Sequence, residues 1–153
     1  MFNLIISVIS VAVFAILLTA GSAYFDSDKI LSIRDKSKID AAIVKVSTAI
    51  TAYNLIESKF PRSIGDLVPQ YTSEPVLPTG LSWQALTFND ITGEIRICLG
   101  GSVQNHVYQA LISSKNDAGK DRFIIGSSCG DQEDVVFSEK SASYPVVVTY
   151  TIK

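Results

Sequence analysis

The chain opens with a long apolar stretch. No charged residue occurs from Phe2 to Phe25. As a helix, this stretch would extend over about 36 Å, which is enough to cross a hydrocarbon layer of about 30 Å with some tilt. Residues 1–25 are therefore expected to form a transmembrane and assembly helix. Its apolar positions are Phe2, Leu4, Ile5, Ile6, Val8, Ile9, Val11, Val13, Phe14, Ile16, Leu17 and Leu18.

Two features of this stretch leave alternatives open. The tripeptide 21–23, Gly-Ser-Ala, is typical of a signal-peptidase site, but the apolar run exceeds a usual signal core and no Lys or Arg precedes it. A retained membrane helix fits better. Ser7, Ser10 and Thr19 interrupt the aliphatic residues. Such residues either let helices approach closely in lipid or bond the helix's own carbonyls.

A second helical pattern follows, in which apolar residues recur in steps of three and four. Its members are Ile39, Ile43, Val46, Ile50 and Tyr53, with Lys38, Asp40 and Lys45 on the other face. No proline occurs before Pro61, so the pattern predicts an amphipathic helix over residues 26–58 that continues the first one. We interpret the apolar stripe as a surface packed on the head, in preference to a partner site.

Residues 59–153 have the pattern of a strand-rich head. Ser63 and Asp66 suggest a capping box for one short turn, and prolines keep the chain irregular to about residue 80. Strands are predicted at 81–88, 94–99, 123–127 and 144–152, a helix at 102–114, and a further short strand at 135–137. The expected fold class is α+β: a long N-terminal helix packed on a small antiparallel sheet of about four strands.

Length and charge narrow the possible functions. Of the 153 residues, those after Phe25 suffice for one globular domain. The formal net charge is -2, and the 13 basic residues are scattered among 15 acidic ones. No basic run is available to displace counterions from phosphates, so nucleic-acid binding is not expected.

Two cysteines, Cys98 and Cys129, lie in the head. They would form a disulfide if the head is outside the cytoplasm, and buried free thiols are the alternative. Basic residues soon after the apolar stretch, among them Lys29 and Arg34, favour a cytoplasmic head by the positive-inside rule. Because these cations alternate with aspartates, they also fit a solvated helix face, and we give more weight to the cysteines.

Candidate chemistry in the head is sparse. The single histidine, His106, lacks a nucleophile and an acid in a recognisable arrangement, and Asn105-His106 is expected to be a surface pair. The segment 100–102, Gly-Gly-Ser, lacks the phosphate-loop pattern. Carboxylates at 131, 133 and 134 do not match a calcium loop, and Trp83 is expected in the core. We expect no enzyme, cofactor, metal site or small-molecule substrate.

Taken together, the chain resembles the type IV pilin and pseudopilin family. The resemblance rests on the apolar helix that runs into the amphipathic segment 49–53, on Phe60-Pro61-x-Ser63, and on a late cysteine pair. In that family the two cysteines bracket a variable region, here 98–129, and a helix inside it resembles the type IVb subclass. The resemblance implies a filament subunit, with residues 1–25 as assembly helix, 26–58 as its continuation and 59–153 as the head.

Two departures from the family pattern qualify the implied role. The sequence shows no basic leader ending in Gly, and it has Ile5, or Ile6 if Phe2 is the first mature residue, where the family usually has Glu. The family Glu neutralises a neighbouring subunit's N-terminal amine in the filament. Its absence favours a minor pilin over a major one.

Several expectations about partners and location follow from the resemblance. The partners would be pilin-like subunits or pilus assembly proteins, together with the membrane. The head would be periplasmic, on an inner-membrane anchor, or extracellular in a filament. The alternatives are a leaderless membrane-anchored accessory protein for type IVb pilus assembly, and an anchored binding module that recognises a ligand through residues 98–129.

Overall fold

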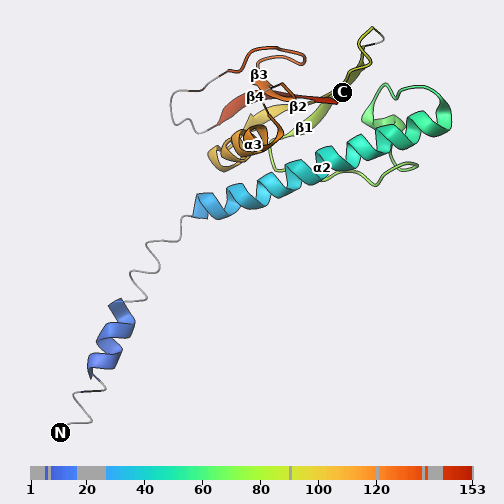
Figure 1. Ribbon diagram of the computed structural model, residues 1–153. Helices are drawn as coiled ribbons and strands as arrows, with labels where there is room; N and C mark the ends of the chain where they lie inside the picture. Colours follow the sequence, from blue (N-terminus) through green and yellow to red (C-terminus); the bar gives the residue numbers. More distant parts are fainter. Residues whose placement is uncertain are drawn as a thin grey trace.

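The computed structural model describes residues 6, 8–16, 27–89, 91–119, 121–135, 137 and 143–152 (Figure 1). The α+β fold expected from the sequence is confirmed, with one long helix beside a four-stranded antiparallel sheet. The elements in chain order are α2 (Ser27–Glu57), η1 (Ile64–Asp66), β1 (Ser82–Phe88), β2 (Ile95–Val103), α3 (Asn105–Ala118), β3 (Phe123–Gly126) and β4 (Tyr144–Ile152). Residues 6 and 8–16 are also helical.

Helix α2 buries one side along most of its 31 residues. At about 1.5 Å per residue it is about 46 Å long. The buried positions recur at helical spacing and include four of the five predicted stripe residues; they are Asp35, Ile39, Ala42, Ile43, Val46, Ala49 and Ile50. The fifth, Tyr53, is half-buried and contacts Tyr71 edge to face, with ring centroids 5.1 Å apart.

The end of α2 has a local cause. Ser58 adopts a left-handed conformation with φ of 54°, and its N–H donates to the Asn54 carbonyl at 2.9 Å. Pro61 then prevents the helix from resuming. The predicted capping box is present: the Asp66 carboxylate accepts the N–H groups of Arg62 and Ser63 at 2.8 and 3.0 Å. This turn places Leu67, which is fully buried, beneath the sheet's first strand.

The sheet has the strand order β1-β2-β4-β3, with every neighbouring pair antiparallel. The central pair, β2 and β4, stays in register from Ile95↔Ile152 to Val103↔Tyr144. Strand β4 has the predicted bounds. Strand β2 extends to Val103, so the predicted end at residue 99 and the predicted helix start at 102 are wrong, and α3 begins at Asn105.

Glycines explain why β2 continues where turn chemistry was expected. A Cβ atom at Gly101 would lie 1.9 Å from the Gly80 carbonyl oxygen, so the backbone at 80 can approach β2 only because residue 101 lacks a side chain. The segment 100–102 is therefore part of a paired strand. It does not form a phosphate-binding loop.

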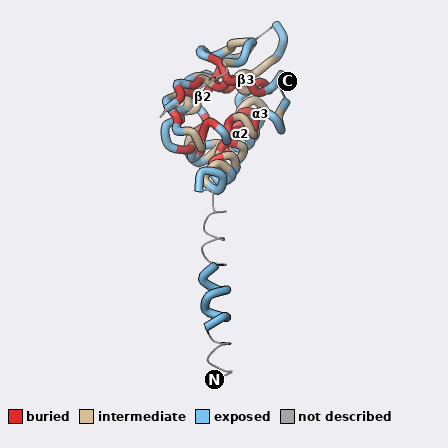
Figure 2. Tube along the Cα trace, turned by 90° about the vertical axis from the view of Figure 1, so that its left-hand side faces the viewer, coloured by how far each residue is buried: buried red, intermediate tan, exposed pale blue. Residues whose placement is uncertain are grey.

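The core lies between the sheet and the two helices, which cover the same face (Figures 1 and 2). One cluster joins Ile39 and Ile43 of α2 to Val107 and Leu111 of α3 and to Val148 of β4, among others. A second cluster joins the next turns of α2 to β1, β2 and the 60–71 loop, and contains Val46, Ala49, Ile50, Leu67, Leu86 and Ile97. The expected core residue, Trp83, is partly buried against both clusters.

The edge strand β3 is covered on its free side by a later part of the chain. The N–H of Val135 donates to the Ile125 carbonyl at 2.8 Å, and the Asp134 carboxylate accepts the Ile125 N–H at 3.2 Å. The short strand predicted at 135–137 is not formed at Val135 or Phe137, and Val136 lies outside the described residues.

Candidate functional site

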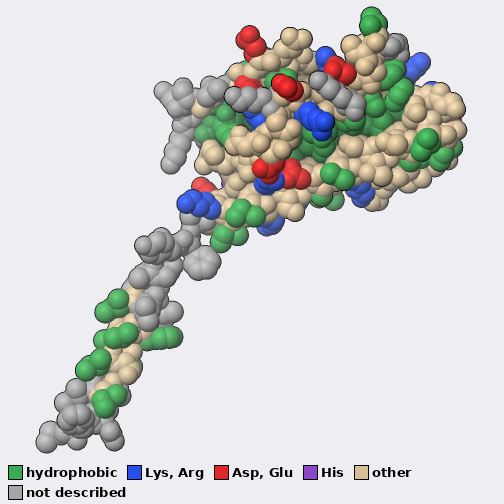
Figure 3. Space-filling model, in the orientation of Figure 1, with side chains coloured by type: hydrophobic (Ala, Val, Ile, Leu, Met, Phe, Trp, Pro, Cys, Tyr) green, Lys and Arg blue, Asp and Glu red, His purple; other side chains and the backbone are tan. Residues whose placement is uncertain are grey.

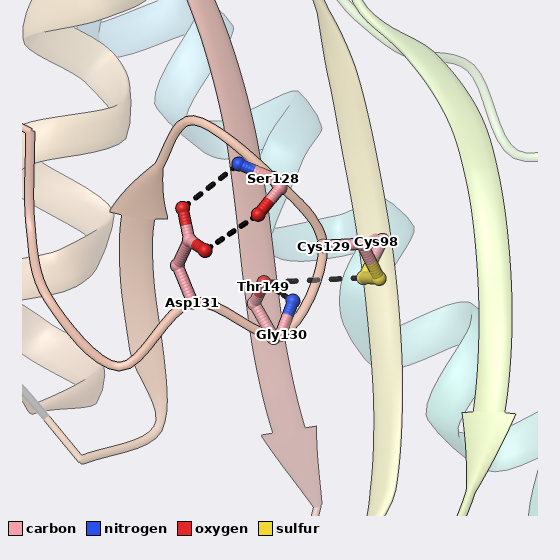
Figure 4. Close-up of a disulfide and its surroundings, with 6 residues drawn as sticks. All are labelled: Cys98, Ser128, Cys129, Gly130, Asp131 and Thr149. Carbon is pink, nitrogen blue, oxygen red and sulfur yellow. Dashed lines mark hydrogen bonds between the residues drawn. A yellow bond between two sulfur atoms is a disulfide. The ribbon is translucent and has the colours of Figure 1, made fainter.

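A disulfide joins the loop after β3 to the middle of the sheet, on the face opposite the helices (Figure 4). Cys98 on β2 is fully buried, and it is bonded to Cys129 with Cα atoms 5.7 Å apart. The N–H of Gly130 donates to the Thr149 hydroxyl on β4 at 2.9 Å. Thr149 is only 2% exposed because this loop covers it. The disulfide thus closes the bracketed region 98–129 covalently and holds the loop at its end against the outer sheet face.

One carboxylate organises that loop. Asp131 accepts hydrogen bonds from the hydroxyl and the N–H of Ser128, at 2.5 and 2.8 Å (Figure 4). It also accepts the N–H of Ser127 at 2.8 Å. These bonds, with the Ser128 hydroxyl first, lower the pKa of Asp131 from 3.8 to about 2. Each of them favours the ionised carboxylate.

Acid is expected to weaken this loop through Asp131. Because its pKa is lower in the folded than in the unfolded chain, Asp131 stabilises the fold above the ordinary value of 3.8, and this contribution is lost as pH falls toward about 2. Urea unfolding midpoints can be measured as the pH is lowered from 3.8 toward about 2. Over this pH range the midpoint should fall less steeply for Asp131→Asn than for the wild type. Asp121→Asn, at an exposed position of the same region, is the matched control. Equal slopes for Asp131→Asn and wild type would contradict this role.

A second carboxylate of this region is engaged separately. Asp134 pairs with Lys115 of α3 and accepts the Ile125 N–H, so it ties the loop to α3 and β3. Among the described residues, no group of three or more His, Cys, Asp or Glu side chains is placed to hold a metal ion. The carboxylates at 131 and 134 organise the loop through these contacts.

A buried charge cluster joins α2 to the start of α3. Asp35 is 2% exposed, and its carboxylate lies 3.4 Å from His106 Nε2, 3.5 Å from Lys38 Nζ and 3.7 Å from Arg34 Nε. The expected surface pair Asn105-His106 is therefore wrong for His106, whose side chain is 17% exposed and faces α2. The sequence held a signal for this site, because Asp35 precedes Ile39 by four residues and so falls on the buried stripe.

Replacing Asp35 with Ala is expected to lower the free energy of unfolding by about 1 to 2 kcal/mol. The change removes the carboxylate through which α2 contacts His106 of α3, while Lys38 and Arg34 keep access to water. Urea unfolding followed by circular dichroism measures the loss. Asp117→Ala, which removes a carboxylate of α3 that pairs with Lys36 of α2 at the exposed surface, should cost less because water screens that pair. A cost for Asp35→Ala no larger than that of the control would show that the cluster does not stabilise the helix pair.

Exposed apolar residues dominate the described part of the N-terminal segment. Residues 8–16 are helical and exposed, and Figure 3 shows no charged side chain among those drawn there. The expected membrane-helix residues among them are Ile6, Val8, Ile9, Val11, Val13, Phe14 and Ile16, each at least 49% exposed. Phe2, Leu4, Ile5, Leu17 and Leu18 lie outside the described residues. The Ser10 hydroxyl bonds the Ile6 carbonyl at 2.8 Å, so at this position the helix satisfies its own polar group.

One row of exposed positions on α2 is also uncharged over several turns, with the exposed Lys45 beside it. We call this set the outer stripe; it consists of Ser37, Ala41, Val44, Thr48, Thr51 and Leu55, all exposed. The hydroxyls of Thr48 and Thr51 donate to the carbonyls of Val44 and Ser47, at 2.9 and 3.1 Å. Another helix could therefore cover these two threonines without leaving their hydroxyls unpaired.

Among the described residues, α2 is the one helix long and apolar enough to cross a membrane. A third (33%) of its most apolar window is buried against the head, so length and composition alone are weak grounds for such a span. This finding is compatible with a membrane-associated chain. In comparisons with known proteins, no family model, curated protein or solved structure matches the chain.

Proposed function

We propose that this chain is a structural subunit of an extracytoplasmic pilus or pseudopilus, most consistent with a minor pilin. In this proposal residues 1–25 hold the protein in the inner membrane and later pack with other subunits. The head stays outside the cytoplasm. Pilin-like subunits are the partners, and the protein carries out no catalysis.

The observation that carries the proposal is the two-sided character of α2. Its inner side is fixed on the sheet by Ile39, Val46 and Ile50, which are each at most 1% exposed. Its outer stripe is uncharged and has its threonine hydroxyls satisfied. A rod that presents such a side, preceded by an exposed apolar helix at 8–16, suits close packing of parallel helices.

The disulfide supports a location outside the cytoplasm. Disulfides persist in the periplasm and on cell surfaces and are rare in the cytosol. The bond between Cys98 and Cys129 therefore favours the membrane orientation that leaves the head in an oxidising compartment, despite the basic residues early in α2.

Shearing filaments from cells tests the proposal. The wild-type chain should be recovered with the filaments, and Ala41→Glu, in the outer stripe, should remain in the membrane because it places a charge in the helix-packing surface. Asn116→Glu, at an exposed site on α3, is the matched control and should still enter filaments. Wild-type protein confined to the inner membrane would overturn the proposal.

The membrane-anchored accessory protein is the second candidate. It is favoured by Ile5 and Ile6, since neither position offers the acidic group that a repeating subunit would use to fix its register. A stable complex with pilus assembly proteins in the membrane, without any filament incorporation, would support this role over the first.

A further inference from the structure

The start of α2 presents exposed apolar and basic side chains together. Ile30 is 52% exposed and Ile33 is 70% exposed, whereas the next isoleucine on the helix, Ile39, is fully buried. Lys29 is exposed beside them, and the Arg34 side chain is 61% exposed. We call Lys29, Ile30, Ile33 and Arg34 the proximal surface. Figure 3 shows basic and hydrophobic side chains at this end of the head.

An open cavity of about 510 Å³ adjoins the proximal surface, between the starts of α2 and α3. Its polar lining is rich in hydrogen-bond donors; the lining residues are Asp28, Lys29, Ser32, Ile33, Asn105, His106 and Gln109. Within the described part of the chain, the side chains of Lys29, Ser32, Asn105 and Gln109 make no hydrogen bond or ion pair. These four groups are therefore available to a ligand that accepts hydrogen bonds.

The chain length places this surface close to the apolar segment. Ile30 follows Phe25 by five residues. Even fully extended, five residues reach only about 18 Å, and as a helix they rise about 8 Å. The polar layer on each side of a bilayer is about 5 to 8 Å thick. If residues 1–25 span the membrane, the proximal surface has to lie at or near the lipid headgroups.

We propose that the proximal surface docks on the outer leaflet of the membrane, with Ile30 and Ile33 in the headgroup layer and phosphate-bearing headgroups in the adjoining cavity. This inference rests on the membrane anchoring in the proposed function. Apolar side chains flanked by cations are the combination that interfacial helices use. Docking would fix the head against the membrane before assembly.

The charges at this end favour anionic lipid. Lys29, Arg34 and Lys38 are cationic, and Asp28 at the cavity rim opposes them. Asp35 is buried beneath Arg34 and Lys38, so it offsets part of their charge while remaining out of contact with solvent. Against these three cations the sequence places three aspartates, Asp26, Asp28 and Asp35; because Asp35 is buried, the cations outnumber the carboxylates that a lipid surface could meet. Phosphatidylglycerol should therefore be preferred over phosphatidylcholine.

The test uses the full chain reconstituted in vesicles of phosphatidylcholine, alone or mixed with phosphatidylglycerol. An environment-sensitive fluorophore is attached at Ile33→Cys, and in a matched sample at Thr51→Cys, an exposed position on the same helix about 27 Å farther along. Bromolipids should quench the label at 33 and leave the label at 51 unaffected. Lys29→Gln and Arg34→Gln should each lower the equilibrium constant for docking on phosphatidylglycerol vesicles, measured from the quenching at position 33, about fivefold.

Each outcome decides between the proposals. If the protein floats with the vesicles but the label at 33 is quenched no more than the label at 51, the docking is wrong and the anchor stands. The label at 33 could instead be as shielded from water in detergent as it is in vesicles, and become exposed when the protein is diluted. A second copy of the chain then covers the surface, and this result also overturns the docking. If the protein does not float with the vesicles, the membrane anchor and the docking fall together.

Discussion

Reduction of the Cys98–Cys129 disulfide is expected to lower the free energy of unfolding of the head by about 3 to 4 kcal/mol. The bond closes a loop with a sequence separation of 31, and opening it restores that loop's freedom in the unfolded chain. This loss would be a large part of the stability of an ordinary small domain, which is about 5 to 15 kcal/mol.

The native contacts at the disulfide add to the expected effect. Cys98 is fully buried, and the bonded loop covers Thr149, whose hydroxyl accepts the Gly130 N–H. Without the bond, water would gain access to the outer face of β2 and β4. Asp131 would still hold its own turn through Ser127 and Ser128, so we expect the loop to detach as a unit.

Urea unfolding of the full chain, with and without reductant, measures the loss. The variant carrying Cys98→Ala and Cys129→Ala should match the reduced wild type and should not respond to reductant. An unchanged unfolding midpoint on reduction would show that the covalent bond adds nothing to the contacts around it.

Much of this architecture was predictable from the sequence because it depends on periodicity. The three- and four-residue steps from Ile39 to Ile50 identify the side of α2 that packs on the sheet. Strict alternation predicted the bounds of β4, one of the two strands with a partner on each side. Local turn chemistry also sufficed for the 63–66 capping box, since its hydrogen bonds join residues at most four apart.

The features that the sequence did not predict depend on contacts between distant residues. Gly101 is typical of a turn, but here it lies in a strand because the backbone at Gly80 packs against it. His106 was expected on the surface, and it faces Asp35, which lies 71 positions earlier in the chain. The cover over Thr149 comes from a loop that the disulfide holds in place. Only the contact at Asp35 left a periodic signal, because Asp35 falls on the buried stripe four residues before Ile39; the other two contacts left none.

The second large effect is expected from Ile50→Ala, which should cost about 2 to 5 kcal/mol of unfolding free energy. Ile50 is 1% exposed and packs in the cluster that α2 forms with Leu67 and Ile97. Its removal would leave a cavity where the helix meets the middle of the sheet. The surrounding backbone is constrained there by α2 on one side and by the paired strands on the other, so only partial relaxation is expected.

Ile56→Ala is the matched control, because it makes the same chemical change on the same helix at a residue that is 69% exposed. Its effect on stability should stay within about 0.5 kcal/mol, and the better helix propensity of Ala could make it slightly favourable. Urea unfolding of both variants gives the comparison. Equal costs would mean that α2 is not held on the sheet by its inner side. A large cost for Ile50→Ala alone would support the division of α2 into an inner side that stabilises the head and an outer stripe that remains free to meet other helices.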